Sequence, residues 1–255
     1  MKITIITVCY NREDTIRDAI KSVISQDYDD IEYIIIDGAS KDRTMDIVNE
    51  YRGKVTHIIS EIDRGMYEAI NKGIRMATGD YIGLVHSDDM LVAPDTISHI
   101  AKQLEETNAD MLYADGIYVD RNNLSKVKRV WKGGKFSRCK LGWGWLPLHT
   151  TVYMRKDFIM QNGLYDERYE ISADTKFLIK CLCHKDIKVT YLPETVILMR
   201  MGGLSTTWAH MSHVWAEDIL LYRQYGFKHP ILLKLLKMVW KVPQYISAFF
   251  TKSPR

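Results

Sequence analysis

Cysteine is scarce in this sequence, and long apolar runs are absent. The four cysteines show no Cys-x-x-Cys spacing, and Cys9 lies within an apolar segment. We therefore expect small buried thiols in a reduced, cytoplasmic protein. The apolar run at the N-terminus is too short for a signal peptide, so we expect none. No uninterrupted apolar run reaches the length of a membrane span.

A large net charge and the phosphate-binding glycine motifs are also lacking. With 35 Lys and Arg against 32 Asp and Glu, the net charge of +3 is too small to indicate nucleic-acid binding by itself, and we expect no such partner. Neither G-x-G-x-x-G nor G-x-x-x-x-G-K-[ST] occurs, which disfavours a Rossmann dinucleotide site and a P-loop. A chain of 255 residues, 46% of them hydrophobic, can nevertheless bury a full core.

What the sequence does contain is a regular alternation of strand-like and helix-like segments. The expected strands are 3–9, 31–36, 55–60 and 81–85, and the expected helices are 16–24, 44–51, 65–77 and 97–104. Strands that alternate with helices of this length predict an α/β fold with a mostly parallel, doubly wound sheet flanked by helices.

The stretch from Gly79 to Met90 carries the strongest chemical signal. An apolar strand at 81–85 ends in His86, Ser87, Asp88 and Asp89. Adjacent carboxylates repel each other, and a hard cation such as Mg²⁺ or Mn²⁺ removes that cost. In open α/β sheets ligands bind beyond the carboxyl ends of strands, where this pair falls. A simple cap for a following helix stays open as the alternative.

Polar residues follow each of the first four strands in the same way. The pairs are Tyr10-Asn11, Asp37-Gly38, Asp63-Arg64 and Asp88-Asp89. In a parallel sheet they meet at one edge, which gives a nucleotide-sized crevice with acids and no glycine loop for phosphate. If phosphate binds there, a metal ion on the acids must do most of the holding.

Three linked motifs resemble the family 2 glycosyltransferases of the Rossmann-like GT-A fold. They are ITIITVCYNRE, IIIDGASKDRT and DRGMYEAINKGIRMATGDYIGLVHSDD, which together cover residues 3–89. Three further segments are similar to the subgroup of colanic-acid and other bacterial surface-polysaccharide transferases: LPLHTTVYMR at 146–155, YDERYEISADTKFLIKC at 165–181 and MGGLST at 201–206. Matches spread over so much of the chain are far more specific than one short motif.

The resemblance implies a donor site at the edge of the sheet. Thr7 and Tyr10 would line a uridine pocket, and Asp37 would accept a hydrogen bond from the nucleobase or ribose. Asp63, followed by Arg64, would close the base side. The implied partner is a nucleotide-diphosphate sugar.

The resemblance also implies a metal site for Mn²⁺ or Mg²⁺. Asp88 and Asp89 match the last two residues of the family's Asp-x-Asp-Asp, so contacts to ribose and metal are expected of Asp88, and to metal of Asp89. His86 replaces the usual first aspartate. One direct or water-mediated metal contact therefore differs from the family pattern.

Asp174 takes the place of the family's catalytic base. It lies in Ser172-Ala173-Asp174, where the family typically has Glu-Asp. An inverting transfer needs one carboxylate to accept the proton of the attacking hydroxyl. No second carboxylate is required as the acid, because the diphosphate leaves with its charge on the metal. The alternative is that Asp174 caps the helix expected at 176–183; one residue can do both.

Two further residues are candidates for the diphosphate or the acceptor, along with His86. His149 falls where the subgroup carries a histidine, and it precedes an expected strand at 150–154. Its alternative is a structural histidine. Ser205 is expected on a loop that closes over the donor.

The tail after Asp218 has no acidic residue, and its basic residues alternate with apolar ones. Lys234, Lys237 and Lys241 share one helical face, a pattern typical of a helix in a membrane interface. The alternative is a helix packed on the domain or on a second copy. Pro243 is expected to kink or end the first tail helix.

These features predict a GT-A domain at 1–200 and a C-terminal amphipathic helical extension. The domain divides into a nucleotide-sugar half at 1–90 and an acceptor half at 91–200, and residues 201–255 form the donor-closing loop and the basic helices. The predicted function is inverting, metal-dependent transfer of a sugar to a glycan or lipid-linked acceptor in surface-polysaccharide synthesis, on the inner face of the cell membrane. A non-catalytic nucleotide-sugar-binding module and a nucleotidyltransferase are the alternatives, and an oligomer stays open.

Overall fold

The computed structural model describes residues 1–202 and 211–254, except for the side chains of 211–213. Within these ranges nine strands form one mixed sheet in the order β3-β2-β1-β4-β8-β6-β9-β5, with β7 paired to β6. The strands are β1 (Ile3–Cys9), β2 (Ile31–Asp37), β3 (His57–Ser60), β4 (Tyr81–Leu84), β5 (Asp89–Leu91), β6 (Met111–Val119), β7 (Val127–Trp131), β8 (Tyr153–Arg155) and β9 (Val189–Arg200).

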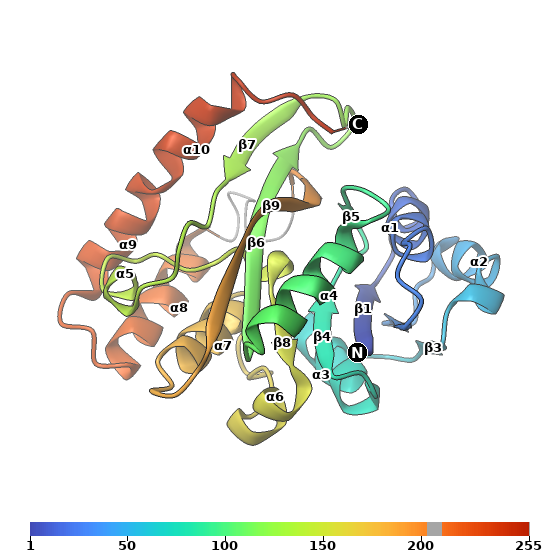
Figure 1. Ribbon diagram of the computed structural model, residues 1–255, viewed down its shortest axis with the longest axis horizontal. Helices are drawn as coiled ribbons and strands as arrows, with labels where there is room; N and C mark the ends of the chain where they lie inside the picture. The colour runs from blue at the N-terminus through green and yellow to red at the C-terminus, as the bar shows by residue number, and fades with distance from the viewer. Residues whose placement is uncertain (203–210, 255) are drawn as a thin grey trace.

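Helices surround this sheet (Figure 1). The helices are α1 (Ile16–Ile24), α2 (Thr44–Asn49), α3 (Met66–Met76), α4 (Thr96–Thr107), α5 (Arg138–Leu141), α6 (Lys156–Asn162), α7 (Ala173–Leu182), α8 (Met211–Gln224), α9 (Pro230–Val239) and α10 (Lys241–Ala248). Two short 3-10 turns are η1 (Arg52–Lys54) and η2 (His149–Thr151). The prediction of an α/β sheet flanked by helices, with a helical C-terminal extension, is confirmed.

The N-terminal half of the sheet is parallel. β1 pairs with β2 from Ile3↔Ile31 to Cys9↔Asp37, and it pairs with β4 on its other side. β3 pairs with β2, also in parallel, at the edge of the sheet. Because all four strands run the same way, their carboxyl ends lie at one edge, as predicted.

The two faces of these strands feed separate cores because successive side chains point to opposite sides of a sheet. Ile6 packs in the cluster that contains α3 and α7 residues, whereas Ile5 packs in the one that contains α1, α2 and α4 residues. Gly73 allows α3 to pack closely on β1, since a Cβ there would lie 2.7 Å from Cγ2 of Ile6.

Two segments differ from the predictions, and both belong to antiparallel parts of the sheet. Asp89 begins β5, which pairs antiparallel with β9, so Ser87 to Asp89 does not cap a helix; the alternative interpretation was wrong. The strand expected at 150–154 is replaced by the turn η2 and the short β8. Such short strands have little periodicity of their own and form through their pairing partners.

The cysteines divide into two kinds. All four are free; Cys9 and Cys181 are buried, while Cys139 and Cys183 are exposed. The expectation of buried thiols therefore holds for two of them. Burial raises the pKa of Cys181 to about 12, which keeps it protonated and inert.

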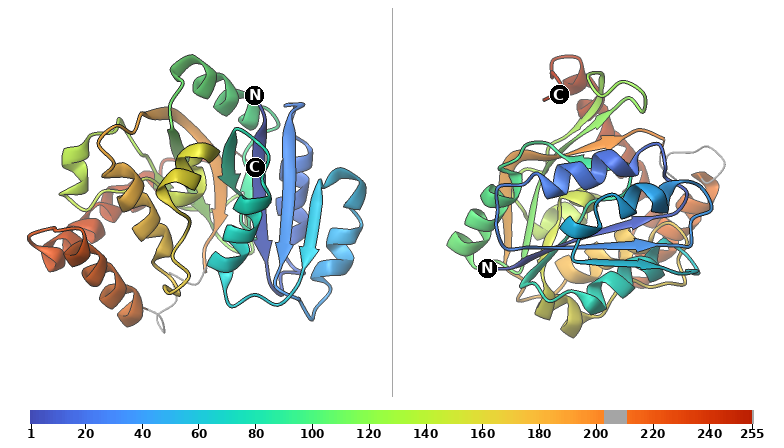
Figure 2. Two further views of the ribbon diagram at one scale, coloured as in Figure 1. Left: turned by 90° about the horizontal axis from the view of Figure 1, so that it is seen from below. Right: turned by 90° about the vertical axis from the view of Figure 1, so that its right-hand side faces the viewer.

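The C-terminal helices pack at the end of the molecule opposite α1 and α2 (Figures 1 and 2). α10 contacts β7, where Arg129 donates from Nε to Gln244 at 2.6 Å. α9 ends at Val239 and α10 begins at Lys241, so the break precedes Pro243, which lies in the first turn of α10. None of the helices in the described part of the chain is long and apolar enough to cross a membrane.

The orientation of α9 and α10 differs from the prediction. Lys234 is 6% exposed and lies 2.5 Å from a carboxylate oxygen of buried Asp218 on α8, and Lys237 lies 3.2 Å from the same oxygen. The lysine face therefore points inward. The outward side carries exposed apolar residues: Ile231, Leu232, Leu235, Met238, Val239, Trp240, Val242, Tyr245, Ile246, Phe249 and Phe250.

Candidate active site

Two predicted donor residues, Tyr10 and Asp63, lie beside Gly38 at the carboxyl end of β1 and β2. Tyr10 is 52% exposed, and its ring lies beside Gly38. A Cβ built on Gly38 would lie 3.5 Å from Cδ2 of Tyr10 and 3.8 Å from Oδ2 of Asp63. An exposed aromatic ring next to open backbone and a carboxylate suits a planar, hydrogen-bonding ligand such as a nucleobase.

Asp37 and Thr7 lie below this edge instead of on it. Asp37 is fully buried, and its carboxylate accepts hydrogen bonds from the backbone N–H of Ser40 at 3.0 Å and from the hydroxyl of Ser60 at 2.6 Å. Thr7 is also fully buried, and its hydroxyl donates to the carbonyl of Val85 at 2.7 Å. Both were expected to contact the donor directly, whereas in the structure they hold the loops that form the edge.

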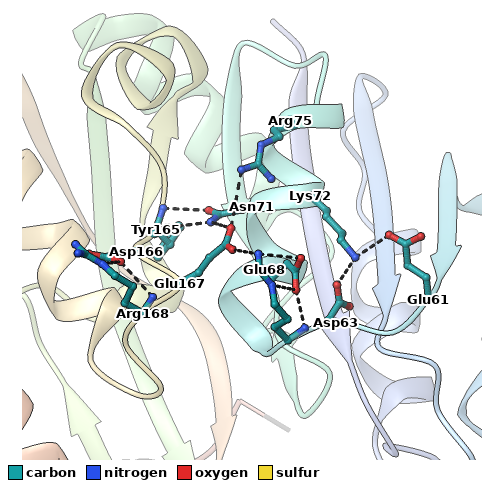
Figure 3. Close-up of polar contacts among 11 residues, drawn as sticks. Glu61, Asp63, Glu68, Asn71, Lys72, Arg75, Tyr165, Asp166, Glu167 and Arg168 are labelled. Carbon is teal, nitrogen blue, oxygen red and sulfur yellow. Dashed lines mark hydrogen bonds and ion pairs between the residues drawn. The ribbon is translucent and has the colours of Figure 1, made fainter.

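A network of charged residues continues the edge from Asp63 toward α3 (Figure 3). Lys72 lies 2.5 Å from a carboxylate oxygen of Asp63, and Arg64 forms ion pairs with Glu68 and, at 2.7 Å, with Glu167. Arg64 is 79% exposed, so these pairs contribute little to stability and leave its guanidinium accessible to a ligand.

The acid pair after β4 has one oxygen with no protein partner. Asp89 is 2% exposed, and its Oδ2 makes no hydrogen bond. Burial and then the neighbouring charge of Asp88 raise the pKa of Asp89 well above its ordinary value, although Arg200 acts against them. Asp88 is partly exposed; its carbonyl accepts from Arg200 at 3.0 Å, and its carboxylate lies 4.0 Å from Arg121.

These residues fit a divalent ion that is shared with a ligand. A cation would satisfy the unpaired oxygen and relieve the repulsion between Asp88 and Asp89. In the described part of the chain, no group of three or more His, Cys, Asp or Glu could hold a metal ion. The remaining ligands would therefore come from phosphate oxygens and water, as is usual for Mg²⁺ sites.

Asp174 lies in the first turn of α7, and its charge raises the pKa of His86. Its carboxylate accepts from the backbone N–H of Thr175 at 2.6 Å, and Ser172, not Asp174, is the N-cap residue. Asp174 thus accepts a hydrogen bond from one of the first backbone N–H groups of α7, although it is not the N-cap residue. Burial raises its pKa, and Lys237 is the strongest opposing influence.

His86 and His149 form a stacked pair in this site. Their ring centroids are 6.1 Å apart, and Nε2 of His149 lies 2.7 Å from the hydroxyl of Tyr165. Burial lowers the pKa of both histidines to about 4, so both are neutral at pH 7. The charges of Asp88 and Asp174 raise the pKa of His86 and so oppose the effect of burial. Ser205 lies outside the described residues.

Sequence reasoning missed three residues at this site. Arg200, at the end of β9, bridges Asp18 and the carbonyl of Asp88. Asp218 on α8 and Lys237 on α9 pair with each other at 3.2 Å, and the charges of both affect the pKa of Asp174. The lysine spacing was visible in the sequence, but it does not reveal which side of the helix is buried.

Comparison with known proteins identifies the class. The model of glycosyl transferase family 2 matches residues 4–168. A PGL/p-HBAD biosynthesis glycosyltransferase of Mycobacterium bovis is 30% identical over 191 residues, which are 73% of this chain and 72% of the relative. The chain therefore belongs to glycosyl transferase family 2, and it is a glycosyltransferase. This membership decides against the nucleotidyltransferase alternative.

Solved structures confirm the GT-A fold. S. aureus TarS 1–349 in complex with UDP-GlcNAc has a TM-score of 0.69 at 19% identity, over 97% of this chain and 79% of that chain. Compared with the larger S. aureus TarS chain, the match spans 39% of the TarS length. The mannosyltransferase PcManGT from Pyrobaculum calidifontis, in complex with GDP-Man and Mn²⁺, has a TM-score of 0.67 at 16% identity, over 98% of this chain and 74% of that chain.

Proposed function

We propose that this glycosyltransferase is inverting and metal-dependent, and that it moves a sugar from a UDP-sugar donor to a glycan or lipid-linked acceptor in bacterial surface-polysaccharide synthesis. The observation that carries the proposal is the buried, unpaired carboxylate oxygen of Asp89 beside Asp88, which suits a divalent ion. The names of the similar proteins support it, since two of them are bound to nucleotide sugars and one of these also to Mn²⁺.

Each part of the edge has a distinct task in this proposal. Tyr10 and Asp63 hold the nucleobase, and Arg64 closes the base side. Asp88 and Asp89 would hold Mn²⁺ or Mg²⁺, which when bound stabilises the charge of the leaving diphosphate. Residues 1–90 thus act on the donor and 91–200 on the acceptor.

Asp174 is the general base of the proposed reaction. The acceptor hydroxyl oxygen attacks the anomeric carbon and forms the new glycosidic bond, while the bond from that carbon to the diphosphate oxygen breaks with its electron pair. Asp174 takes the hydroxyl proton. Because the oxygen attacks the face of the anomeric carbon opposite the diphosphate, the product sugar has inverted configuration and the nucleoside diphosphate leaves as an anion.

The outward side of α9 and α10 supports a peripheral membrane location on the cytoplasmic side. Phe249 and Phe250 are 86% and 85% exposed, and Lys228 before α9 and Lys252 after α10 are exposed as well. Apolar and aromatic side chains with flanking lysines are typical of helices that lie in an anionic lipid interface. In this revised form of the proposal, the apolar side and not the Lys234–Lys237 side faces the lipid.

One assay tests the chemistry. Purified protein is incubated with a panel of nucleotide sugars, an acceptor mixture and Mn²⁺, and release of the nucleoside diphosphate is followed with and without EDTA. For Asp174→Asn we expect kcat to fall by at least ~100-fold with donor affinity little changed, as for removal of a general base. Asp186→Asn, an exposed acid outside the site, is the matched control. Full activity of Asp174→Asn, or full wild-type activity in EDTA, contradicts the proposal.

A further inference from the structure

Helix α3 holds residues 165–172, the segment that leads into α7. Asn71 is 1% exposed; its amide nitrogen donates to the carbonyl of Tyr165 at 2.9 Å, and its amide oxygen accepts from the N–H of Tyr165 at 3.0 Å (Figure 3). One turn earlier in the same helix, the hydroxyl of Tyr67 donates to the carbonyl of Ile171. The segment is therefore fixed near both of its ends by α3.

The middle of this segment reaches the donor edge through Glu167. One carboxylate oxygen of Glu167 accepts from the amide nitrogen of Asn71 at 2.9 Å, and the other accepts from Nη2 of Arg64 at 2.7 Å (Figure 3). Because Asn71 is buried and also bonded to Tyr165, it fixes the direction of the Glu167 side chain. The guanidinium of Arg64 is thus held by a residue that comes from the proposed acceptor half of the chain.

Among the described residues, Glu167 makes the shortest contact with this guanidinium. Glu68 also contacts Arg64, but its closest hydrogen bond, at 2.6 Å, comes from the backbone N–H of Arg64. The contacts of Glu68 with the guanidinium are longer, 3.2 Å to Nε and 3.3 Å to Nη2. Glu68 therefore serves mainly the turn at which α3 begins, and the position of the Nη2 end of Arg64 depends on Glu167.

An exposed arginine benefits from such a partner when it binds a ligand. Arg64 is 79% exposed, and a long side chain that moves freely in water loses rotamer freedom on binding, which weakens affinity. A guanidinium that a carboxylate already holds loses less of this freedom. Its five N–H groups point in several directions, so one hydrogen bond to Glu167 leaves others for a ligand.

We infer that Glu167 is a positioning residue for the donor: it fixes the guanidinium of Arg64 before the donor binds, so that a residue of the acceptor half completes the donor site. The inference rests on the proposed place of Arg64 at the base side of the donor. It also gives a role to the segment YDER at 165–168, which the proposed reaction does not use. The ion pair is exposed and adds little stability, so its effect is expected in donor affinity.

A double-mutant cycle on nucleotide affinity tests this inference. Binding of UDP, and of GDP as a second probe, is measured by calorimetry with Mn²⁺ for wild type, Glu167→Gln, Arg64→Met and the double variant. Glutamine keeps an oxygen that can accept from Asn71, so the change removes only the charged partner of Arg64. We expect Glu167→Gln to weaken binding of the preferred nucleotide about fivefold, and by less than about twofold when Arg64 is already replaced.

Arg75→Gln is the matched control. Arg75 is a second cation near Glu167, 3.9 Å from the carboxylate oxygen that Asn71 bonds, and it is 54% exposed. Its replacement changes the charge around Glu167 but leaves the contact with Arg64 in place, so nucleotide affinity should keep its wild-type value. In the complete reaction, Glu167→Gln should raise the donor KM about fivefold with kcat little changed, because Glu167 acts on donor binding.

Three results overturn the inference: unchanged or tighter nucleotide binding in Glu167→Gln, an equal loss in the Arg64→Met background, or a loss of the same size in Arg75→Gln. Circular dichroism checks that each variant is folded, and Glu167→Asp, which is one methylene shorter, replaces Glu167→Gln should the latter not fold.

The variant Arg64→Met separates this inference from the proposed function. If Arg64→Met weakens nucleotide binding but Glu167→Gln does not, the donor role of Arg64 stands and only the inference fails. If Arg64→Met binds both nucleotides as wild type does, or if wild type binds neither, the proposed donor contact and the inference fail together.

Discussion

Removing the carboxylate of Asp218 is expected to be among the most destabilising single changes in this protein. In Asp218→Asn, the buried Lys234 and the partly buried Lys237 lose the anion that lies 2.5 and 3.2 Å from them. Breaking a buried ion pair by removing one partner costs about 3–5 kcal/mol, because a buried charge is left uncompensated. For a chain of this size, that corresponds to a fall in Tm of roughly 10 °C.

Urea unfolding followed by circular dichroism measures this loss. Glu50→Gln is the surface control: it removes an exposed partner of Arg17, which bonds Glu50 at 2.7 Å, and should cost far less stability than Asp218→Asn because solvent screens the pair. The double variant Asp218→Asn with Lys234→Met should regain part of the loss because it also removes one unpaired cation.

The pH dependence of this loss of stability also comes from the ion pairs of Asp218 with Lys234 and Lys237. Burial raises the pKa of Asp218, but Lys237 and Lys234 together lower it below the ordinary value. A carboxyl with a lowered pKa contributes stability that is present above its ordinary pKa and is lost as the pH falls through the folded-state value. The difference in stability between wild type and Asp218→Asn should therefore shrink in acid. A loss below 1 kcal/mol at pH 7, or one that does not change with pH, refutes this reasoning.

Three further predictions concern single residues. Asp89→Asn should abolish turnover yet keep or raise Tm, because a buried carboxylate with a raised pKa gains nothing by ionising in the apo protein; a lowered Tm contradicts this. Tyr10→Ala should raise KM for the donor with kcat little changed, and an unchanged KM would remove the exposed ring from the donor site. Gly144→Ala should destabilise by about 2 kcal/mol more than Gly226→Ala in urea unfolding. Both glycines have φ +74°, but only Gly144 faces a backbone oxygen, that of Leu233; equal losses would contradict a steric contact.

The sequence predicted the parallel half of the fold well because its signals are local. The segment 3–9 alternates between two cores and is buried throughout, and 16–24 has a single apolar face, so both were placed with their observed bounds. The position of the acids together at one edge of the sheet followed from the parallel arrangement of the strands alone. Asp174 was located by its motif, and its burial and its place in the first turn of α7 are structural findings.

The remaining features depend on contacts between distant residues. β5 exists because three residues from Asp89 pair with β9, a partner more than a hundred positions away. The inward direction of Lys234 depends on Asp218, which the lysine spacing does not indicate. Thr7 was expected to line the uridine pocket because its motif matches; its burial and its hydrogen bond to the carbonyl of Val85 come from the packing of β1 against β4.

The short connection between β4 and β5 has a consequence for which parts of this fold can change in sequence and length. β4 belongs to the parallel half, through β1, while β5 is attached to the other half, through β9. The residues between them, including Asp88, are thus anchored from two sides, and Arg200 fastens the Asp88 carbonyl to the end of β9. Loops in the second half of the chain can therefore lengthen or change composition without moving these acids.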